Sequence, residues 1–589
     1  GPRAVQVTLP DSGTVQGQRV TLGLSDSVAR VVGPGQLTGA AREDEQPISR
    51  VSWTELARFE MTPPQGDDPM RVERVRFVGE VEAIDRDTTL TGGRVMAEFR
   101  PTEGDGFEIA EVDVRDGVEV TDGGGAEVRA KRMLGSFSPR QDEATAANEV
   151  ALNDQLTFVG DVFVKRDTTE LRSRTLDATL VPDGDSRRIG RIDARDGVRF
   201  ERKGDRLLAV ADRLVGEAEQ ERVELTGDLV LLSQGPSRIR ATQAVLDGEA
   251  RTMEVFGEGV YEQVDDSGAA EATVVWSDGM VIDDESGTLE CTGDAFARWR
   301  AGLDGVDDIS AERINVTYNA SSDGGGEPLA FERQQSNRQI TKVVAIGGDR
   351  LEGNGKPAIV QSLREVAVAS GDRSLERLFR LEGPEIIADN QTGVLRVEHP
   401  GRLVLADLRP EDGTGAPSAG ASMAPGDSGT ARGSALFDWT ESMVADRSAG
   451  TVLMIGDVRM THARLADGLR TDLRSDRLLA RFRETRIVDN ELAAFELGPP
   501  SEDATVEIDL ESVLGEGSVS LMSGSRELLA DRLDYNADTG VVDATARQGN
   551  RVSLFDPGRV SPIRARAITW DLTTDRIDIQ RPDPFVQPR

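Results

Sequence analysis

Strict alternation of apolar and polar residues, repeated along the chain, is the feature that most constrains its fold. Residues 112–120 read Val-Asp-Val-Arg-Asp-Gly-Val-Glu-Val, and residues 192–200 read Ile-Asp-Ala-Arg-Asp-Gly-Val-Arg-Phe without a gap. A period of two is typical of a β-strand, because successive side chains point to opposite faces. The sequence therefore predicts an all-β chain in which a unit of about 80 residues, holding several strands, is duplicated.

A second, longer repeat links the two ends of the chain. Residues 15–37 align without a gap with residues 381–403. Farther along, Trp-Thr-Glu at 53–55 returns at 439–441. A large internal duplication is the simplest explanation.

Two short units recur between these repeats. The first is a small residue, two polar residues and an aliphatic residue, as at 211–214, and it predicts the start of a strand. The second is glycine, an acid and an aliphatic residue, as at 79–81 and 160–162, and it predicts a tight bend or bulge at which another strand begins. Helical periodicity is weak by comparison, even in the helix-forming stretches 140–154 and 361–379.

Linker-like composition divides the chain. Residues 319–337 contain three consecutive glycines, and residues 410–434 are rich in Gly, Ala, Ser and Pro. We expect a first lobe at 1–318 that starts inside a repeat, a linker or long loop at 319–337, and a second lobe at 338–589 that carries the loop at 410–434.

Charge excludes one class of partner. The chain has 69 basic and 105 acidic side chains and a formal net charge of -36. This field repels phosphate backbones, and no basic stripe with interleaved aromatic residues is present, so nucleic-acid binding is not expected. An anionic membrane surface would repel the chain as well. No apolar run approaches the roughly 18 residues typical of a membrane span.

Catalytic and metal sites are not predicted, and no cofactor is expected. The two histidines, His399 and His462, are expected in structural or surface roles, and Cys291 as a small buried side chain. The acidic stretches 283–287 and 304–308 lack the ligand spacing of a calcium loop and are expected to be solvated turns. With 105 acids, no single carboxylate pair stands out as a glycosidase site.

The repeated order of the two short units resembles the OstA-like family, which includes the LptA and LptC type lipopolysaccharide transport proteins. The pattern covers about 75–579 and is clearest at 530–542, where Ala-Asp-Arg-Leu-Asp-Tyr leads through Asn-Ala-Asp-Thr-Gly into a second strand. The resemblance implies an elongated, repetitive β-jellyroll in which two splayed antiparallel sheets form a V-shaped groove. It also implies a periplasmic location, with any signal or N-terminal anchor absent from the printed sequence.

The family groove would be lined by apolar residues that alternate inward. The residues expected to line it are Val81, Phe99, Val114, Val120, Phe163, Leu180, Ile192 and Phe200. The resemblance implies lipopolysaccharide or a related lipid as the ligand. Exposed strand edges could also add other β-jellyroll transport components or copies of the chain itself.

Three functions are compatible with these features. The first is a lipid-binding bridge or outer-membrane assembly factor, which requires an open apolar groove. The second is a structural β-solenoid or surface scaffold with a dry interior and no lipid cargo. The third, a polysaccharide-active enzyme, would need a distinct catalytic segment, which the sequence lacks.

Overall fold

Among the residues that the computed structural model describes, all regular structure is β-strand. None of the residues it describes forms a helix of the length and apolarity needed to cross a membrane. The described residues are 5–9, 13–23, 26–39, 49–62, 71–101, 107–139, 154–183, 186–204, 206–265, 267–300, 305–319, 340–348, 355–367, 373–408, 433–464, 468, 470–486, 506–537, 539–572 and 574–582.

The chain divides into two compact units, one with the strands up to Phe256 and one with the strands from Gly257 onward. The linker predicted at 319–337 lies, apart from residue 319, outside the described residues, so the predicted lobe boundaries stay predictions. The loop predicted at 410–434 also lies outside them, except that Gly433 and Ser434 begin a strand.

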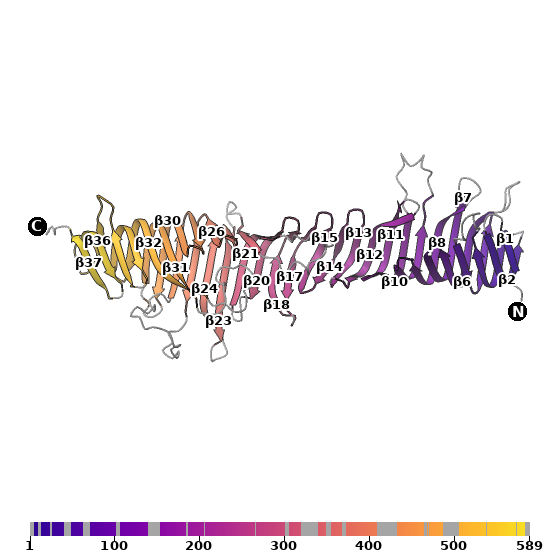
Figure 1. The fold of residues 1–589 in the computed structure, drawn as a ribbon, viewed down its shortest axis with the longest axis horizontal. Helices are drawn as coiled ribbons and strands as arrows, with labels where there is room; N and C mark the ends of the chain where they lie inside the picture. Colours follow the sequence, from indigo (N-terminus) through magenta and orange to yellow (C-terminus); the bar gives the residue numbers. More distant parts are fainter. Residues whose placement is uncertain are drawn as a thin grey trace, which may run out of the picture. The chain divides into compact units, whose positions relative to one another are not determined.

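Unit 1 is an antiparallel meander in which most strands pair with the next strand of the chain (Figure 1). Its strands are β1 (Val5–Leu9), β2 (Gly13–Gly23), β3 (Val28–Thr38), β4 (Ser49–Trp53), β5 (Leu56–Met61), β6 (Val72–Asp85), β7 (Thr88–Pro101), β8 (Phe107–Thr121), β9 (Glu127–Ser136), β10 (Asp154–Arg166), β11 (Thr169–Asp183), β12 (Ser186–Arg202), β13 (Leu207–Glu217), β14 (Arg222–Gln234), β15 (Ser237–Asp247) and β16 (Thr252–Phe256).

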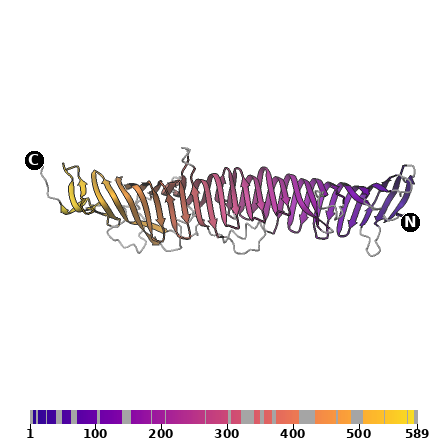
Figure 2. The ribbon, with the colours of Figure 1, turned by 90° about the horizontal axis from the view of Figure 1, so that it is seen from above.

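Unit 2 repeats this antiparallel scheme, and Figure 2 shows the strands of each unit following one another in chain order. Its strands are β17 (Gly259–Val264), β18 (Ala270–Trp276), β19 (Gly279–Asp283), β20 (Thr288–Arg300), β21 (Gly305–Tyr318), β22 (Ile340–Ile346), β23 (Ala358–Ala367), β24 (Arg373–Gly383), β25 (Glu385–Asp389), β26 (Val394–Glu398), β27 (Gly401–Asp407), β28 (Gly433–Trp439), β29 (Ser442–Asp446), β30 (Thr451–Arg464), β31 (Arg470–Arg486), β32 (Val506–Ser523), β33 (Arg526–Asn536), β34 (Val541–Thr545), β35 (Val552–Phe555), β36 (Ile563–Asp571) and β37 (Arg576–Pro582).

The helix-forming stretches follow the same rule where they are described. Residues 361–367 and 373–379 lie in β23 and β24, so packing against neighbouring strands overrides their local preference. Apart from Asp154, which begins β10, the stretch 140–154 lies outside the described residues.

The two short sequence units form opposite sides of one β-bulge, as where the pair 456–457 of β30 faces the single residue Asp476 of β31. This confirms the predicted bulge and corrects the prediction that strands start at these units. In β6 the pair 79–80, with φ of 86° and 39°, faces the single residue Gly93 of β7. In β12 the pair 196–197 faces the single residue Asp212 of β13. Two residues against one is the definition of a bulge, and positive φ is easiest for Gly and tolerable for Asp. The units therefore mark the middle of long strands.

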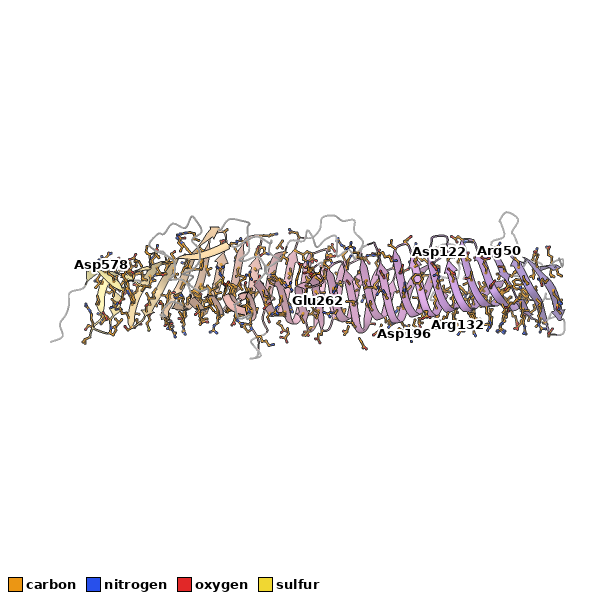
Figure 3. The ribbon with its side chains drawn as sticks, turned by 90° about the horizontal axis from the view of Figure 1, so that it is seen from below. Arg50, Asp122, Arg132, Asp196, Glu262 and Asp578 are labelled. Atoms are coloured by element: carbon orange, nitrogen blue, oxygen red, sulfur yellow. The ribbon has the colours of Figure 1, made fainter. Side chains whose placement is uncertain are left out.

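Each bulge divides a long strand into two arms. The first arm holds Phe77 in β6 and Val114 in β8, and the second arm holds Val81 in β6 and Val120 in β8. Figure 3 shows Arg132 and Asp196, beside the bulges, along one long edge of unit 1. Arg50 and Asp122, at the far ends of the second arm, lie along the opposite edge.

The sheet folds sharply at the bulges, so that the apolar faces of the two arms turn toward each other. Val114 pairs with Val95, and Gly92 lies three residues farther along β7 in the second arm. In a flat sheet this separation would keep Gly92 far from Val114. A β-carbon on Gly92 would nevertheless overlap the Cγ1 of Val114. We call the apolar faces that meet in this way the inner faces.

A buried tryptophan fills this fold at three places, which we call the tryptophan corners. Trp53, Trp276 and Trp439 are each at most 2% exposed. In each case the indole lies where the β-carbon of a facing glycine would be, and these glycines are Gly35, Gly259 and Gly401. The corners at Trp53 and Trp439 confirm the duplication read from the sequence. The sequence analysis missed the Trp276 copy, although Trp-Ser-Asp at 276–278 followed by Gly-Asp at 293–294 repeats the pattern of 439–441 and 456–457.

Candidate functional site

The inner faces of unit 1 are dry next to the bulges. The side chains nearest the bulges form a row on each arm, and all of them are less than 9% exposed. The first-arm row consists of Phe77, Val95, Val114, Met133, Phe158, Leu176, Ala194 and Leu214, and the second-arm row of Val81, Val118, Ala130, Val162, Val198, Ala211 and Val230. We call these the corner rows. They are an ordinary close-packed core.

Exposure rises toward the strand ends, on the same inner faces. One step beyond the second-arm corner row, Leu90, Val120, Val128, Val164 and Phe200 are half-buried. Toward the ends of the first arm, Phe99, Leu180 and Ile192 are half-buried, and Ile109 and Ile189 are 44% and 52% exposed. We call these residues the rim rows. The second-arm row also holds residues that are at most 6% exposed, namely Leu171, Ala209, Leu232 and Ile239. The inner faces are thus closed at the bulges and open to solvent at part of the strand ends, chiefly between β7 and β12.

Seven of the eight predicted lining residues lie on the inner faces. Val81 and Val114 are in the corner rows at 1% and 0% exposure, so they are core. The other five are in the rim rows: Val120, Phe200, Phe99, Leu180 and Ile192.

Phe163 is the exception, and its prediction as an inner residue is corrected. It pairs with Arg172 and Arg129 on the outer face of the second arm. The guanidinium carbon of Arg172 lies 5.2 Å from the ring centroid, a cation–π arrangement. The bulge at 160–161 inserts an extra residue and resets the alternation, so that Val162 and Val164 face inward and Phe163 faces outward.

Several rim residues were missed from the sequence. Leu90 and Val128 pair with Val120 from either side, and Ile109 pairs with Phe99. Each belongs to an alternating strand, but only the strand register shows that it shares a face with a predicted residue. The information that would have identified these residues is the strand-pairing register, which the sequence alone does not give.

The outer face carries an ion cluster that is duplicated with the repeat. Asp113 is 7% exposed and accepts hydrogen bonds from Arg115 Nη2 at 2.6 Å and from Arg132 Nε at 2.9 Å. Burial would raise the pKa of Asp113, but the hydrogen bonds from the two guanidiniums outweigh it and hold the pKa below its usual value.

The second copy of this cluster is centred on Asp193, 80 residues later in the aligned repeat. Asp193 accepts hydrogen bonds from Arg213 Nη2 and Arg195 Nη2, each at 2.6 Å. The hydrogen bond from Arg213 is the main reason that the pKa of Asp193 lies far below its usual value, against the opposing effect of burial. These clusters stabilise the outer face and do not reach the rim rows.

The histidines and the acidic turn considered as catalytic or metal-binding residues make structural contacts. His399, at φ 91°, donates its backbone N–H to Glu441 O at 2.7 Å, and its carbonyl accepts the indole N–H of Trp439 at 3.1 Å. The Oδ1 of Asp283 accepts two backbone N–H groups of its own turn, from Glu285 and Ser286. His462 pairs with Ala435 in the β28–β30 ladder. Within the described ranges, no group of three His, Cys, Asp or Glu side chains has the geometry of a metal site.

Unit 2 closes its inner faces more completely at its C-terminal end. The second row beyond the bulge there consists of Leu473, Leu521, Leu528 and Leu554, and none of them is more than 4% exposed. On the other arm, Val542 and Trp570 pair directly and are 1% and 2% exposed. These strands form a dry core where unit 1 has open rim rows.

Comparison with known proteins identifies part of this architecture. Residues 142–268, which run from just before β10 into β17, match the family model described as LptA/(LptD N-terminal domain) LPS transport protein. A search of curated proteins gave no match. Over residues 142–268 the chain is thus similar to the LptA/LptD N-terminal-domain family of lipopolysaccharide transport proteins, which confirms the resemblance predicted from the sequence.

Proposed function

We propose that the rim rows of unit 1 bind the acyl chains of lipopolysaccharide or a similar multi-acyl lipid. The protein would carry or bridge this lipid toward the outer membrane, within the periplasm and without a catalytic step. The family match at 142–268 supports a role in lipopolysaccharide transport, and the remaining details are the proposal.

One observation carries the proposal. From β7 to β12 of unit 1, most apolar inner-face residues pass from less than 9% exposed beside the bulges to half-buried or exposed at the strand ends, with Leu171 at 6% as an exception. A protein that bound nothing would gain by closing this surface, because exposed apolar area costs about 25 cal/mol per Å². Two inner faces that converge at the bulges and open at their rims are therefore suited to hold an apolar ligand.

The rim rows suit acyl chains in particular. Val120, Leu90 and Val128 lie side by side on three successive strands, and neighbouring strands are about 4.8 Å apart. A linear chain running across the strands would contact one aliphatic side chain after another. Each buried methylene contributes about 0.8 kcal/mol, so several acyl chains can give stable binding without a polar anchor.

Joining to neighbours would use strand edges. Among the described strands, β1 pairs only with β2, so its other edge has no partner strand there. An edge of this kind can accept a strand from another β-jellyroll component or from a copy of the chain. We include edge addition in the proposal because a bridge requires contact with a neighbour.

A structural scaffold without cargo is the second candidate. The dry C-terminal rows of unit 2 favour it, because there the inner faces are filled by leucine and tryptophan side chains and leave no room for a ligand. The two candidates differ in whether the rim rows of unit 1 are occupied.

Native mass spectrometry with lipid extraction tests the proposal, after expression of the full chain in cells that make lipopolysaccharide. We expect co-purified lipopolysaccharide or another multi-acyl lipid with the wild-type protein. Val120→Asp and Phe200→Asp should each reduce the bound fraction at least about 10-fold, because a carboxylate in the rim row must be desolvated by the acyl chain.

Phe163→Asp is the matched control, since Phe163 lies on the outer face of the same unit between Arg172 and Arg129. This variant should retain the lipid. A wild-type protein that is lipid-free and fails to bind added lipid would support the scaffold instead. Equal loss in all three variants would show that the effect does not come from the inner faces.

A further inference from the structure

Three arginines face one another across adjacent strands on the outer face of unit 1. Arg30 of β3 pairs with Arg58 of β5, and Arg58 pairs with Arg76 of β6. Their neighbours along each strand, Val31 and Ala57 among them, are buried on the inner face, so the arginines point outward. Directly opposed like charges destabilise a sheet. We call this row the arginine ladder.

Acidic neighbours only partly neutralise the ladder. Arg58 Nη2 lies 3.0 Å from a Glu60 oxygen, and Arg30 Nη2 lies 3.9 Å from an oxygen of Asp26. The Nε of Arg58 is buried without a hydrogen-bond partner. Among the residues that the structure describes, Arg76 has no ion pair. In a chain with a net charge of -36, this is a local excess of positive charge.

A hollow lies beside the arginine ladder, and two of the ladder's arginines line it. The hollow is lined by Arg58, Glu60, Arg74, Arg76 and Met96, which gives three guanidiniums and one carboxylate. Glu60 also lies 3.3 Å from Arg74 Nη1, and Arg74 donates to Glu98 at 2.8 Å. Glu60 and Glu98 are thus engaged with Arg74, and the hollow keeps a net positive charge.

The duplication shows that the fold does not require this ladder. The second copy has Arg396 where the first has Arg30, and in β29 and β30 the next two positions are Val444 and Leu453, paired in the same register. The Trp276 corner has Val281 opposite Glu290 in the corresponding ladder. Two corners thus form the same strand pairs without the second and third arginine. The repulsion in the first copy therefore has no structural purpose of its own.

We propose that the arginine ladder and its hollow bind a phosphate group, carried by a lipid headgroup or present as free phosphate. Guanidinium groups bind phosphate oxygens through paired, charge-assisted hydrogen bonds. Bound phosphate would give Arg76 and the Nε of Arg58 the acceptors they lack and would remove the repulsion within the row. A hollow lined by five side chains matches a single phosphate group better than an extended acidic peptide. The site lies on the outer face and is independent of lipid binding by the rim rows.

Titration of the full chain with inorganic phosphate, followed by calorimetry at about 0.15 M salt to screen the overall negative charge, tests the proposal. The test variant combines Arg58→Val and Arg76→Leu, the residues that the second copy carries at these positions. We expect it to fold, as judged by an unchanged thermal unfolding midpoint or a higher one, and to weaken phosphate binding at least about 10-fold.

The control variant combines Arg199→Val and Arg396→Leu. It removes two charges from exposed arginines that pair with Glu201 and Glu398 on their own strands, as Arg58 does with Glu60. Phosphate binding should be unchanged in this variant. Equal binding by the wild type and the ladder variant, or no phosphate binding by the wild type, would overturn the proposal.

Vesicle flotation distinguishes the two sources of phosphate. Ladder-dependent binding to phosphatidylcholine vesicles that contain phosphatidic acid, and no binding to phosphatidylcholine alone, would assign the site to a lipid headgroup. Phosphate binding without vesicle binding would assign it to the free anion. Ladder-dependent binding of a short oligoglutamate peptide that is tighter than phosphate would overturn the phosphate assignment and indicate an acidic protein partner.

Discussion

Unit 1 and the C-terminal strands of unit 2 have the same kind of bulge, but they differ in the exposure of the next row of inner-face side chains. Beside the bulge, Val118 in unit 1 and Val519 in unit 2 are 3% and 2% exposed. One step farther, Val120 of unit 1 is half-buried, whereas Leu521 of unit 2 is 3% exposed and Leu528 is 0% exposed. The bulge folds the sheet in both units, and the second row decides whether the inner faces close.

Side-chain size explains much of the difference. Leucines in the second row of unit 2 reach farther across the inner space than the valines at 120, 128 and 164 of unit 1. On the facing arm of unit 2, Trp570 adds a large aromatic side chain, whose indole N–H donates to Asp575 at 3.2 Å. Close packing excludes both water and ligand. The same fold can thus provide a binding surface or a core through its second row.

A charged residue introduced into the second row should give the largest difference in stability between the two units. We expect Leu528→Asp to lower the free energy of unfolding of unit 2 by about 4 kcal/mol or more, because the carboxylate is buried without a partner. Val120→Asp should cost only about 1 kcal/mol, because a half-buried side chain can keep its carboxylate hydrated. Urea unfolding followed by tryptophan fluorescence measures both. Similar losses would show that the rim rows of unit 1 are as closed as unit 2.

Thiol labelling sharpens the same contrast without a large change in stability. Cys291 is 0% exposed beside the bulge at 293–294 of unit 2, and burial, aided by the neighbouring Glu290, raises the pKa of its thiol to about 12. In a Cys291→Ser background, the thiol introduced by Val120→Cys should react with a maleimide at least about 1,000-fold faster than Cys291 does in the wild type. This ratio corresponds to about 4 kcal/mol of protection.

Added lipid provides the control for the labelling experiment. Lipopolysaccharide should slow labelling of the Val120→Cys thiol and leave that of Cys291 unchanged. Fast labelling of Cys291 in the native protein would mean that unit 2 opens readily and is no dry core.

The acid stability of the two units should differ by a smaller amount. An aspartate with a lowered pKa stabilises the fold above its unfolded pKa of about 3.9, and this contribution is lost as the pH falls below that value. Asp193 in unit 1 is of this kind, chiefly through its hydrogen bond from Arg213. Asp193→Asn should cost about 1–3 kcal/mol at pH 7 and flatten the loss of stability below about pH 5.

The exposed bulge residue Asp457 of unit 2 is the matched control for this experiment. It also accepts hydrogen bonds from two arginines, Arg474 and Arg459, but its side chain is 34% exposed. Asp457→Asn should cost less than about 1 kcal/mol, because solvent screens exposed ion pairs. Equal effects in thermal unfolding at pH 4 and pH 7 would contradict the assigned burial of the Asp193 cluster.

Strand content and duplication could be predicted because both depend on local patterns. The alternation at 112–120 and 192–200 became β8 and β12, and the aligned aspartates Asp113 and Asp193 form the same ion cluster. The face of Phe163 could not be predicted, since a bulge resets the alternation and its position depends on the neighbouring strand. The exposure of the rim rows could not be predicted from the sequence either, because it depends on how far the facing arm extends.

The meander has a consequence for how the chain folds. From β6 to β15 each strand pairs with the next one in sequence, so that contacts are local and loops close over short distances. Low contact order favours rapid folding, and each new hairpin needs only the preceding strand as a template. A chain of this kind can fold progressively from one end as it is delivered, and gain or lose a hairpin in evolution without rebuilding its neighbours.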